Sequence, residues 1–179
     1  MSKRANQFER IAKDYYRTID DRAVKYLLPH LKYGTKFCEP CAGDGILTDQ
    51  LTSTNFLKCT AEYDIEPHNS RIVQKDMFDL TLDDLKGADV IITNPAWSRD
   101  LLHPAILHFK DLAPTWLLFD ADWMHTKQSM SYMEFCTDIV SIGRLIWMEG
   151  TKTSGKDNCC FYRFDKESNG IKFHPKIII

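Results

Sequence analysis

At positions 37–45 the chain reads Phe37-Cys38-Glu39-Pro40-Cys41-Ala42-Gly43-Asp44-Gly45, a short apolar run that stops at a polar, glycine-rich turn. Positions 89–97 have the same build, with Asp89-Val90-Ile91-Ile92-Thr93-Asn94-Pro95-Ala96-Trp97. Each pattern predicts a buried strand that presents functional groups at its carboxyl end. The first turn can enclose a nucleotide-like ligand, and the second presents an amide, a proline-fixed carbonyl and an indole within four consecutive positions.

Strand-like and helix-like runs alternate along the rest of the chain. The predicted strands are residues 36–39, 58–63, 71–75, 89–93, 115–120, 139–148 and 159–164. The predicted helices are residues 8–16, 23–31, 46–52, 82–85, 101–112 and 128–136. This alternation predicts an α/β fold, a mostly parallel sheet with helices on both faces. The last two strands are joined by the polar loop 149–158, where no helix fits, so they should form an antiparallel hairpin.

Length and composition are those of a single globular domain. The chain has 179 residues, of which 44% are hydrophobic and 27% charged. We expect one domain over residues 1–179, with an N-terminal helical segment (1–35), a core (36–165) and a short C-terminal appendage (166–179). No apolar run approaches the ~18 residues that span a bilayer, and the polar start has no signal-peptide core. We therefore expect a cytoplasmic protein whose six cysteines are reduced thiols.

Charge is distributed unevenly along the sequence. Residues 1–36 carry nine Lys and Arg against four Asp and Glu, and residues 150–179 carry six against three. Residues 37–149 carry eight against eighteen. The basic ends fit a nucleic-acid footprint around an acidic core, and they equally fit solvated helix faces.

The glycine turn predicts a cofactor without phosphates. A strand that ends in Glu39, then the turn 42–45, then a helix lets the backbone approach a ligand closely. The turn lacks the third glycine of the dinucleotide fingerprint, which disfavours a pyrophosphate. Cys38 and Cys41 form a C-x-x-C pair, but no second such pair exists in the chain, so we expect neither a metal site nor redox chemistry.

Two acidic positions follow the next strands. Asp64 ends the second strand about twenty residues after the glycine turn, where a carboxylate accepts hydrogen bonds from ribose hydroxyls, with Glu66 as the alternative. Asp76 ends the third strand and can accept from the amino group of an adenine, while Met77 or Phe78 packs on its ring.

The segment 94–97 predicts amino-group chemistry. Pro95 fixes the turn, so the side-chain oxygen of Asn94 and a backbone carbonyl can converge on one exocyclic amino group. Two acceptors draw the nitrogen lone pair out of conjugation and make the nitrogen a better nucleophile. Trp97 supplies a flat surface on which a base can stack.

Taken in order, these motifs resemble those of the class I S-adenosylmethionine-dependent methyltransferases. The segments that carry the resemblance are 39–45, 64–67, 76–77 and 94–97. The last is similar to the Asn/Asp-Pro-Pro-Tyr/Phe/Trp motif of the amino-methylating branch, typified by DNA adenine methyltransferases. Upstream, residues 14–18 are similar to the Tyr-x-Thr-Pro segment of those enzymes. The resemblance covers roughly residues 14–165 and implies a seven-stranded sheet that ends in an antiparallel hairpin.

The resemblance also implies roles for individual residues. The methionine portion of the cofactor would be held by Thr18, Glu39, Pro40, Ala42, Gly43 and Gly45. Its ribose and adenine would be bound by Asp64, Ile65, Asp76 and Met77. Asn94, which also borders the cofactor, Pro95 and Trp97 would be catalytic, and Trp97, Trp123, Lys152 and Lys156 would contact the substrate.

Two departures from the family pattern matter, together with one missing element. Ala96 replaces the second proline of the catalytic motif, and Ile19 replaces the proline after Thr18. The first loosens the catalytic loop but leaves its acceptors and its ring, so we expect activity to survive. Finally, no segment is large enough to be a separate target-recognition domain, so sequence preference would come from short elements such as the 149–158 loop.

The sequence thus predicts transfer of a methyl group to the exocyclic amino nitrogen of adenine in DNA. Adenine in RNA is the first alternative, and the amide of protein glutamine is the next. A catalytically silent cofactor-binding module is a further alternative of a different class. We expect a nucleic-acid partner, no membrane, no metal, and a monomer or small homo-oligomer; the recognition sequence, the oligomeric state and the biological role stay open.

Overall fold

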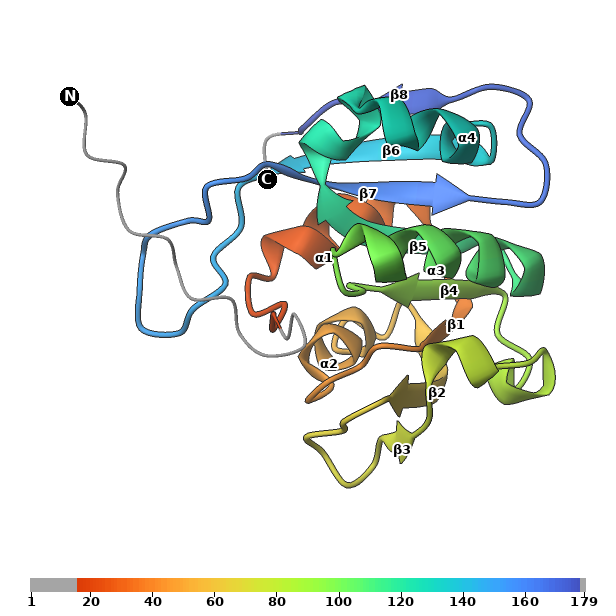
Figure 1. Cartoon of the computed structure of the whole chain (residues 1–179). Helices are drawn as coiled ribbons and strands as arrows, with labels where there is room; N and C mark the ends of the chain where they lie inside the picture. The colour runs from red at the N-terminus through yellow and green to blue at the C-terminus, as the bar shows by residue number, and fades with distance from the viewer. Residues whose placement is uncertain (1–15, 178–179) are drawn as a thin grey trace.

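The computed structural model describes residues 16–177, and these form a single mixed sheet with helices on both faces (Figure 1). The sheet has eight strands in the order β3-β2-β1-β4-β5-β7-β6-β8. The strands are β1 (Lys36–Glu39), β2 (Lys58–Asp64), β3 (Val73–Gln74), β4 (Val90–Thr93), β5 (Thr115–Asp120), β6 (Cys136–Gly143), β7 (Cys159–Phe164) and β8 (Lys172–His174). Pairing is parallel from β3 to β5 and between β6 and β8, and β7 runs antiparallel to both β5 and β6.

Four α-helices connect the strands, together with short 3₁₀ turns. The α-helices are α1 (Arg22–Leu27), α2 (Ile46–Thr52), α3 (Arg99–Leu112) and α4 (Met130–Met133) among the described residues. The 3₁₀ turns are η2 (Leu28–His30), η3 (Met77–Asp79), η4 (Asp83–Leu85), η5 (Ala121–His125) and η6 (Lys127–Ser129). Pro29 explains why the second predicted helix, residues 23–31, changes from α1 into the tighter η2.

The sheet separates two hydrophobic clusters. Strand β5 shows this clearly, because neighbouring side chains of a strand point to opposite faces. Leu117 and Phe119 pack with α3 in one cluster, and Trp116 and Leu118 pack with α1 and α2 in the other. All four side chains are at most 2% exposed. Because both faces are covered, the functional groups are confined to the ends of the strands.

Several predicted elements are confirmed to the residue, and others are shifted. Predicted strands 36–39, 115–120 and 159–164 and predicted helix 46–52 coincide with β1, β5, β7 and α2. The predicted strand 139–148 is wrong in its position, because β6 starts at Cys136 and ends at Gly143, whose φ of +88° bends the chain out of the sheet. Predicted helix 128–136 shrinks to α4 because Cys136 pairs with Phe164. Helix 8–16 falls almost wholly outside the described residues.

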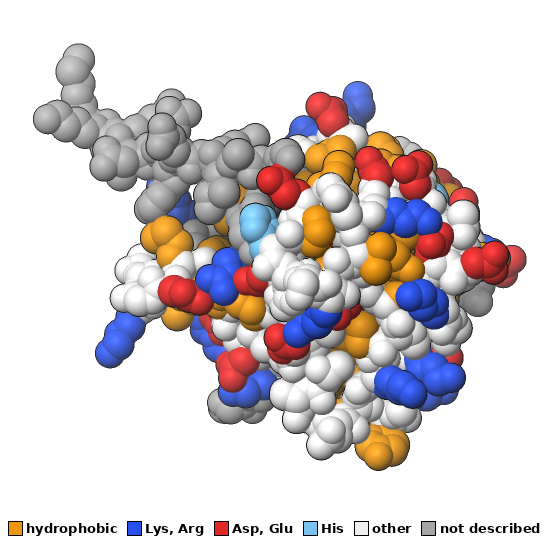
Figure 2. Space-filling view, turned by 90° about the horizontal axis from the view of Figure 1, so that it is seen from below, with side chains coloured by type: hydrophobic (Ala, Val, Ile, Leu, Met, Phe, Trp, Pro, Cys, Tyr) orange, Lys and Arg blue, Asp and Glu red, His pale blue; other side chains and the backbone are white. Residues whose placement is uncertain are grey.

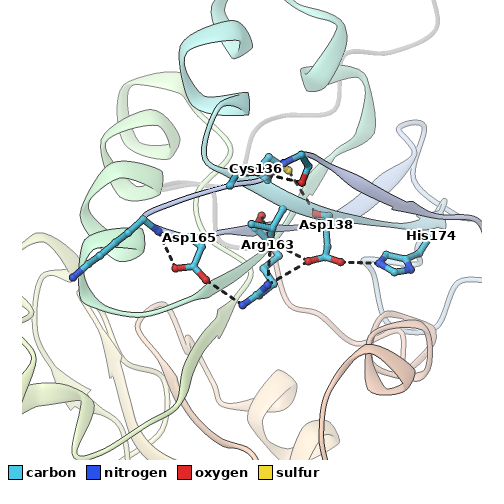
Figure 3. Close-up of polar contacts among 9 residues, drawn as sticks. Cys136, Asp138, Arg163, Asp165 and His174 are labelled. Atoms are coloured by element: carbon cyan, nitrogen blue, oxygen red, sulfur yellow. Dashed lines mark hydrogen bonds and ion pairs between the residues drawn. The ribbon is translucent and has the colours of Figure 1, made fainter.

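Residues 166–179, which were predicted to be a short appendage, contribute an eighth strand to a sheet for which seven strands were expected. Strand β8 is fixed to β6 by a network of charged side chains (Figure 3). Asp138 lies at its centre, with His174 Nε2 at 2.9 Å and Arg163 Nη1 at 3.4 Å, and Arg163 Nη2 is 3.1 Å from Asp165. Partial burial alone would raise the pKa of Asp138, but hydrogen bonds, the largest from His174, outweigh it and hold the pKa below its usual value.

No helix within residues 16–177 combines the length and the apolar character needed to cross a membrane.

Candidate active site

A cavity of about 670 Å³ opens at the carboxyl ends of β1, β2 and β4. Ten residues for which the sequence predicts a role in binding the cofactor line this cavity, namely Thr18, Glu39, Pro40, Ala42, Gly43, Asp64, Ile65, Asp76, Met77 and Asn94. The carboxyl edge of parallel strands is where open α/β sheets bind ligands. The cavity volume lies within the range of roughly 300–1,000 Å³ that is typical of small-molecule sites.

The turn after β1 depends on two glycines. Gly43 and Gly45 have φ angles of +57° and +86°, a conformation that disfavours residues with a Cβ atom. Gly43 lines the cavity and donates its N–H to Asp64 Oδ2 at 2.7 Å. Gly45 does not line it: a Cβ at this position would lie 2.2 Å from the Arg71 guanidinium. The requirement for glycine at position 45 is therefore set by its positive φ, since the Arg71 guanidinium is the end of a flexible side chain that can move aside.

Asp64 organises the next wall of the cavity. Its second oxygen, Oδ1, accepts the N–H of Glu66 at 2.8 Å, so each carboxylate oxygen already accepts one backbone hydrogen bond. Each oxygen keeps a further lone pair for the hydroxyls of a ligand. The adjacent Ile65 side chain is 56% exposed and offers an apolar surface beside this carboxylate.

Asp76 holds a second apolar wall in place. Its Oδ1 accepts the N–H of Phe78 at 2.9 Å and so caps η3, which carries Met77 and Phe78 into the cavity lining. Cys41 Sγ lies 3.6 Å from Met77 Sδ. An acceptor flanked by apolar side chains suits the amino edge of an adenine ring.

Glu39 is a buried acid at the base of the cavity. It is 1% exposed and accepts a hydrogen bond from the hydroxyl of Thr48. Burial raises its pKa to about 8; the hydrogen bonds from Thr48 lower the pKa, and the neighbouring charges of Glu62 and Asp64 raise it. A cation placed in the cavity would favour the ionised form of Glu39. The acidic lining therefore fits a positively charged ligand.

Asn94 is oriented by three neighbours. Its Nδ2 donates to Tyr16 O and Thr18 Oγ1, both at 3.1 Å, and its Oδ1 accepts the indole N–H of Trp97 at 3.0 Å. The indole can only donate and the Tyr16 carbonyl can only accept, so the amide orientation is unambiguous. Oδ1 retains one lone pair for a ligand amino group.

The two tryptophans of the predicted substrate site lie elsewhere than expected. Trp97 is not among the residues that line the cavity; its indole N–H also reaches Leu118 O at 3.1 Å, and its ring meets Trp147 edge to face at 5.6 Å. Trp123 is 4% exposed within the aromatic cluster of Phe119 and Tyr162. A base cannot stack on a buried ring, so the expected substrate contact of Trp123 is replaced by a role in the core.

The two predicted lysines lie on the loop between β6 and β7, outside the cavity. Lys152 lines a second concavity, and Lys156 is exposed on the same loop.

The C-x-x-C pair is divided between two environments, since Cys38 lies in the core with α3 and Cys41 lines the cavity. Within residues 16–177 no three His, Cys, Asp or Glu side chains are grouped to hold a metal ion.

Sequence reasoning missed one residue that joins the two loops beside the cavity. Arg17 Nε lies 2.5 Å from Asp44 Oδ2 in the glycine turn, and Arg17 Nη1 lies 2.9 Å from Glu149 Oε1 in the loop between β6 and β7. The two partners are 27 and 132 residues away along the chain. No local pattern in the sequence marks such a pair.

Comparison with solved structures identifies the fold. A protein from Listeria monocytogenes, assigned as a class I S-adenosylmethionine-dependent methyltransferase, superposes with a TM-score of 0.57 over 89% of this chain and 66% of its own, at 10% identity. The fold is that of the class I methyltransferases. No protein-family model matches the sequence, and no curated protein matches it significantly.

Two of the similar solved structures carry names that refer to RNA. A protein from Pyrococcus horikoshii, assigned as an RNA methyltransferase, superposes with a TM-score of 0.52 at 14% identity, over 82% of each chain. The 23S rRNA methyltransferase ErmE superposes with a TM-score of 0.52 at 12% identity, over 86% of this chain and 71% of its own. At these identities the likeness establishes the class I fold, and the chemistry depends on the residues of the cavity.

Proposed function

We propose that this protein is an S-adenosylmethionine-dependent methyltransferase that modifies the exocyclic amino nitrogen of adenine in DNA. The observation that supports this best is the placement of Asn94 in one cavity with Glu39, Asp64 and Asp76. Three acids and one oriented amide are what a cationic nucleoside cofactor and a target amino group require together. The class I fold supports the same proposal.

In this proposal each acid binds a different part of the cofactor. Glu39 faces its charged methionine end, because a buried carboxyl with a raised pKa gains most from a cation. Asp64 accepts from the ribose hydroxyls, and Asp76 accepts from the adenine amino group between the side chains of Ile65 and Met77. When bound, S-adenosylmethionine supplies an electrophilic methyl group on a sulfonium.

Asn94 prepares the nucleophile. Its open Oδ1 lone pair accepts one N–H of the target amino group, and the backbone carbonyl held by Pro95 accepts the other. Both contacts would raise the electron density on the nitrogen and prepare it to accept the methyl group that bound S-adenosylmethionine would supply, with the thioether S-adenosylhomocysteine as the leaving group and the surplus proton passing to solvent. Trp97 fixes the amide through its N–H. Lys152 and Lys156 contact the phosphates.

The test is transfer of tritiated methyl groups from S-adenosylmethionine to unmethylated duplex DNA, single-stranded DNA, total RNA and protein extract. Asn94→Ala should lower transfer by at least ~100-fold, as loss of one preorganised polar group does. It should leave cofactor affinity within a few-fold of wild type. Asn169→Ala, which changes an exposed asparagine far from the cavity, is the matched control.

The outcomes separate the candidates. Label recovered from DNA as methyladenine and lost with Asn94→Ala would support the proposal. Label in protein glutamine, or no label despite cofactor binding, would overturn it in favour of a different acceptor or a silent binding module.

RNA adenine is the second candidate, and one observation favours it. Two structures that share the fold are named as RNA methyltransferases. Label in RNA alone would select this candidate with the same cavity chemistry.

A further inference from the structure

A second concavity, of about 960 Å³, lies at the same edge of the sheet as the cavity, beside the ends of β5, β6 and β8. We call it the cationic groove and define it by five of its lining residues, His125, Arg144, Lys152, Phe173 and Lys176. The loop between β6 and β7 forms one wall, and η5, which follows β5, forms another. None of the groups that line the cofactor cavity belongs to it.

Three of the cations that line this groove lack acidic partners among the described residues, and a fourth, Arg22, is paired with Asp20. Arg144, Lys152 and Lys176 are exposed, and within residues 16–177 none of them forms an ion pair with a carboxylate. Asp122 is the acid that lines the groove. Some cations elsewhere are paired: blue and red side chains are interspersed on the face in Figure 2, and Lys75 and Arg71 form ion pairs with acids. Unpaired like charges that converge on one concavity favour a polyanion.

Arg22, which also lines the groove, holds the start of the loop between β6 and β7 in place. Its guanidinium is bound by Asp20 at 2.5 Å and also donates to the backbone oxygen of Arg144 at 3.2 Å. Asp20 in turn accepts the N–H of Ile146 at 2.9 Å. These bonds fix the start of the loop while leaving the Arg144 side chain free of an ion pair.

An aromatic ring lies among the cations. Phe173, on β8, is 57% exposed and lines the groove. A large exposed ring within a basic groove is the combination with which proteins bind single-stranded nucleic acids, since the cations follow the phosphates and the ring stacks on a base. A duplex keeps the faces of its bases stacked and out of reach of such a ring.

The groove is connected to the reacting group by a short chain of contacts. Trp147, on the loop that forms the groove wall, lies 5.6 Å from Trp97 and 6.4 Å from Tyr16, measured between ring centroids. Trp97 binds Asn94, and Tyr16 lines the cavity. These contacts link the loop that forms the groove wall to Asn94 and to the cavity.

We propose that the cationic groove binds the sugar-phosphate backbone of single-stranded nucleic acid next to the target base, with Phe173 stacked on a flanking base. This inference rests on the proposed function and specifies its substrate as unpaired. Arg144, Lys152 and Lys176 neutralise phosphates, and Phe173 distinguishes an unpaired strand from a duplex.

The test measures binding, not transfer. Fluorescence anisotropy would follow a labelled oligonucleotide of about 20 nucleotides as single-stranded DNA, single-stranded RNA and duplex DNA, over a series of salt concentrations. The groove variant is R144Q/K152Q/K176Q. The control variant K32Q/K58Q/K86Q removes the same charge from exposed lysines away from the groove. Phe173→Ala tests the ring, and calorimetric titration with S-adenosylmethionine checks the cavity in each protein.

We expect the groove variant to bind single strands at least ~10-fold more weakly, with a salt slope reduced by about 2, since each phosphate contact contributes about 0.7 for single strands. Phe173→Ala should weaken single-strand binding roughly 5-fold or more. The control should stay within about 2-fold, and every variant should bind cofactor like wild type.

Other outcomes would overturn the groove assignment. Equal loss in the groove variant and the control, or tighter binding of duplex with no effect of Phe173→Ala, would do so while leaving the proposed function intact. A wild-type protein that binds cofactor but neither binds nor methylates any nucleic acid would overturn both.

Discussion

The cavity and the cationic groove share one edge of the sheet but differ in charge and in how their groups are held. Acids line the cavity, and hydrogen bonds from backbone N–H groups or hydroxyls hold them, as Asp64, Asp76 and Glu39 show. Basic side chains line the groove, and those of Arg144 and Lys152 extend into solvent without ion pairs among the described residues. The acids of the cavity are held in place by neighbouring donors, whereas the cations of the groove are exposed and can adjust their positions.

This difference predicts that a substitution at one site weakens binding at that site and leaves binding at the other site unchanged. Loss of a cavity acid should damage cofactor binding strongly, because each carboxylate supports the loop as well as the ligand. Loss of a groove cation should cost less per residue and depend on salt.

The largest effect is expected for Asp64→Ala. The change leaves the N–H groups of Gly43 and Glu66 without their acceptors and removes the carboxylate proposed to bind the ribose. A hydrogen bond to a charged group contributes about 1.5–3 kcal/mol, so affinity for S-adenosylmethionine should fall by roughly 100-fold. Calorimetric titration measures this, and Asp83→Ala, at an exposed carboxylate, is the control. Unchanged oligonucleotide binding by the same variant would support two independent sites. An equal loss of cofactor and oligonucleotide affinity would contradict this independence.

The next effect concerns pH and Glu39. Its pKa is raised from 4.5 to about 8 in the folded chain, so the stability that its neutral form provides is complete below pH 4.5 and is lost as pH rises through 8. Between pH 5.5 and 8.5 this linkage lowers the free energy of unfolding by about 3 kcal/mol, a loss that Glu39→Gln should not show. Urea denaturation of both proteins at the two pH values measures the difference. If the free energy of unfolding changed equally with pH in the wild type and in Glu39→Gln, Glu39 would be ionised in the folded protein.

A smaller effect tests whether Trp97 acts through its N–H or through its ring. Trp97→Phe keeps a flat ring but removes the bond to Asn94. If the bond positions the amide, kcat should fall about 10-fold with KM nearly unchanged, as loss of one hydrogen bond of about 1.4 kcal/mol implies. Trp147→Phe makes the same chemical change at the neighbouring ring and serves as the control. Retained kcat in Trp97→Phe together with its loss in Trp97→Ala would show that the ring matters instead.

The smallest effect is expected at the bridge between the two sites. The Arg17–Glu149 ion pair involves a Glu149 side chain that is 68% exposed, and exposed pairs contribute about 0–1 kcal/mol. Glu149→Gln should therefore change the free energy of unfolding by less than ~0.5 kcal/mol and oligonucleotide affinity by less than ~3-fold. Denaturation and anisotropy measure both quantities. A larger loss of oligonucleotide affinity than of stability would show that this loop couples the cavity to the groove.

Sequence reasoning succeeded where local pattern and tertiary pairing agree. Strands β1, β5 and β7 are apolar runs bounded by turn residues, and their predicted limits hold to the residue. It failed at β6, because Leu145 and Ile146 continue an apolar run that the bend at Gly143 removes from the sheet. It also missed β8, whose three residues owe their pairing to β6 and to the Asp138–His174 contact.

The sequence by itself determined the order of strands and helices, the glycine turn and the acids that end successive strands. These are local properties, set by hydrophobic period and turn chemistry. Only the tertiary structure decided that Trp123 is buried, that the Trp97 indole binds Asn94, and that Arg144, Lys152, Phe173 and Lys176 line one groove. Each of these depends on contacts between segments that lie far apart in the chain. Such contacts cannot be predicted from the spacing of residues along the sequence.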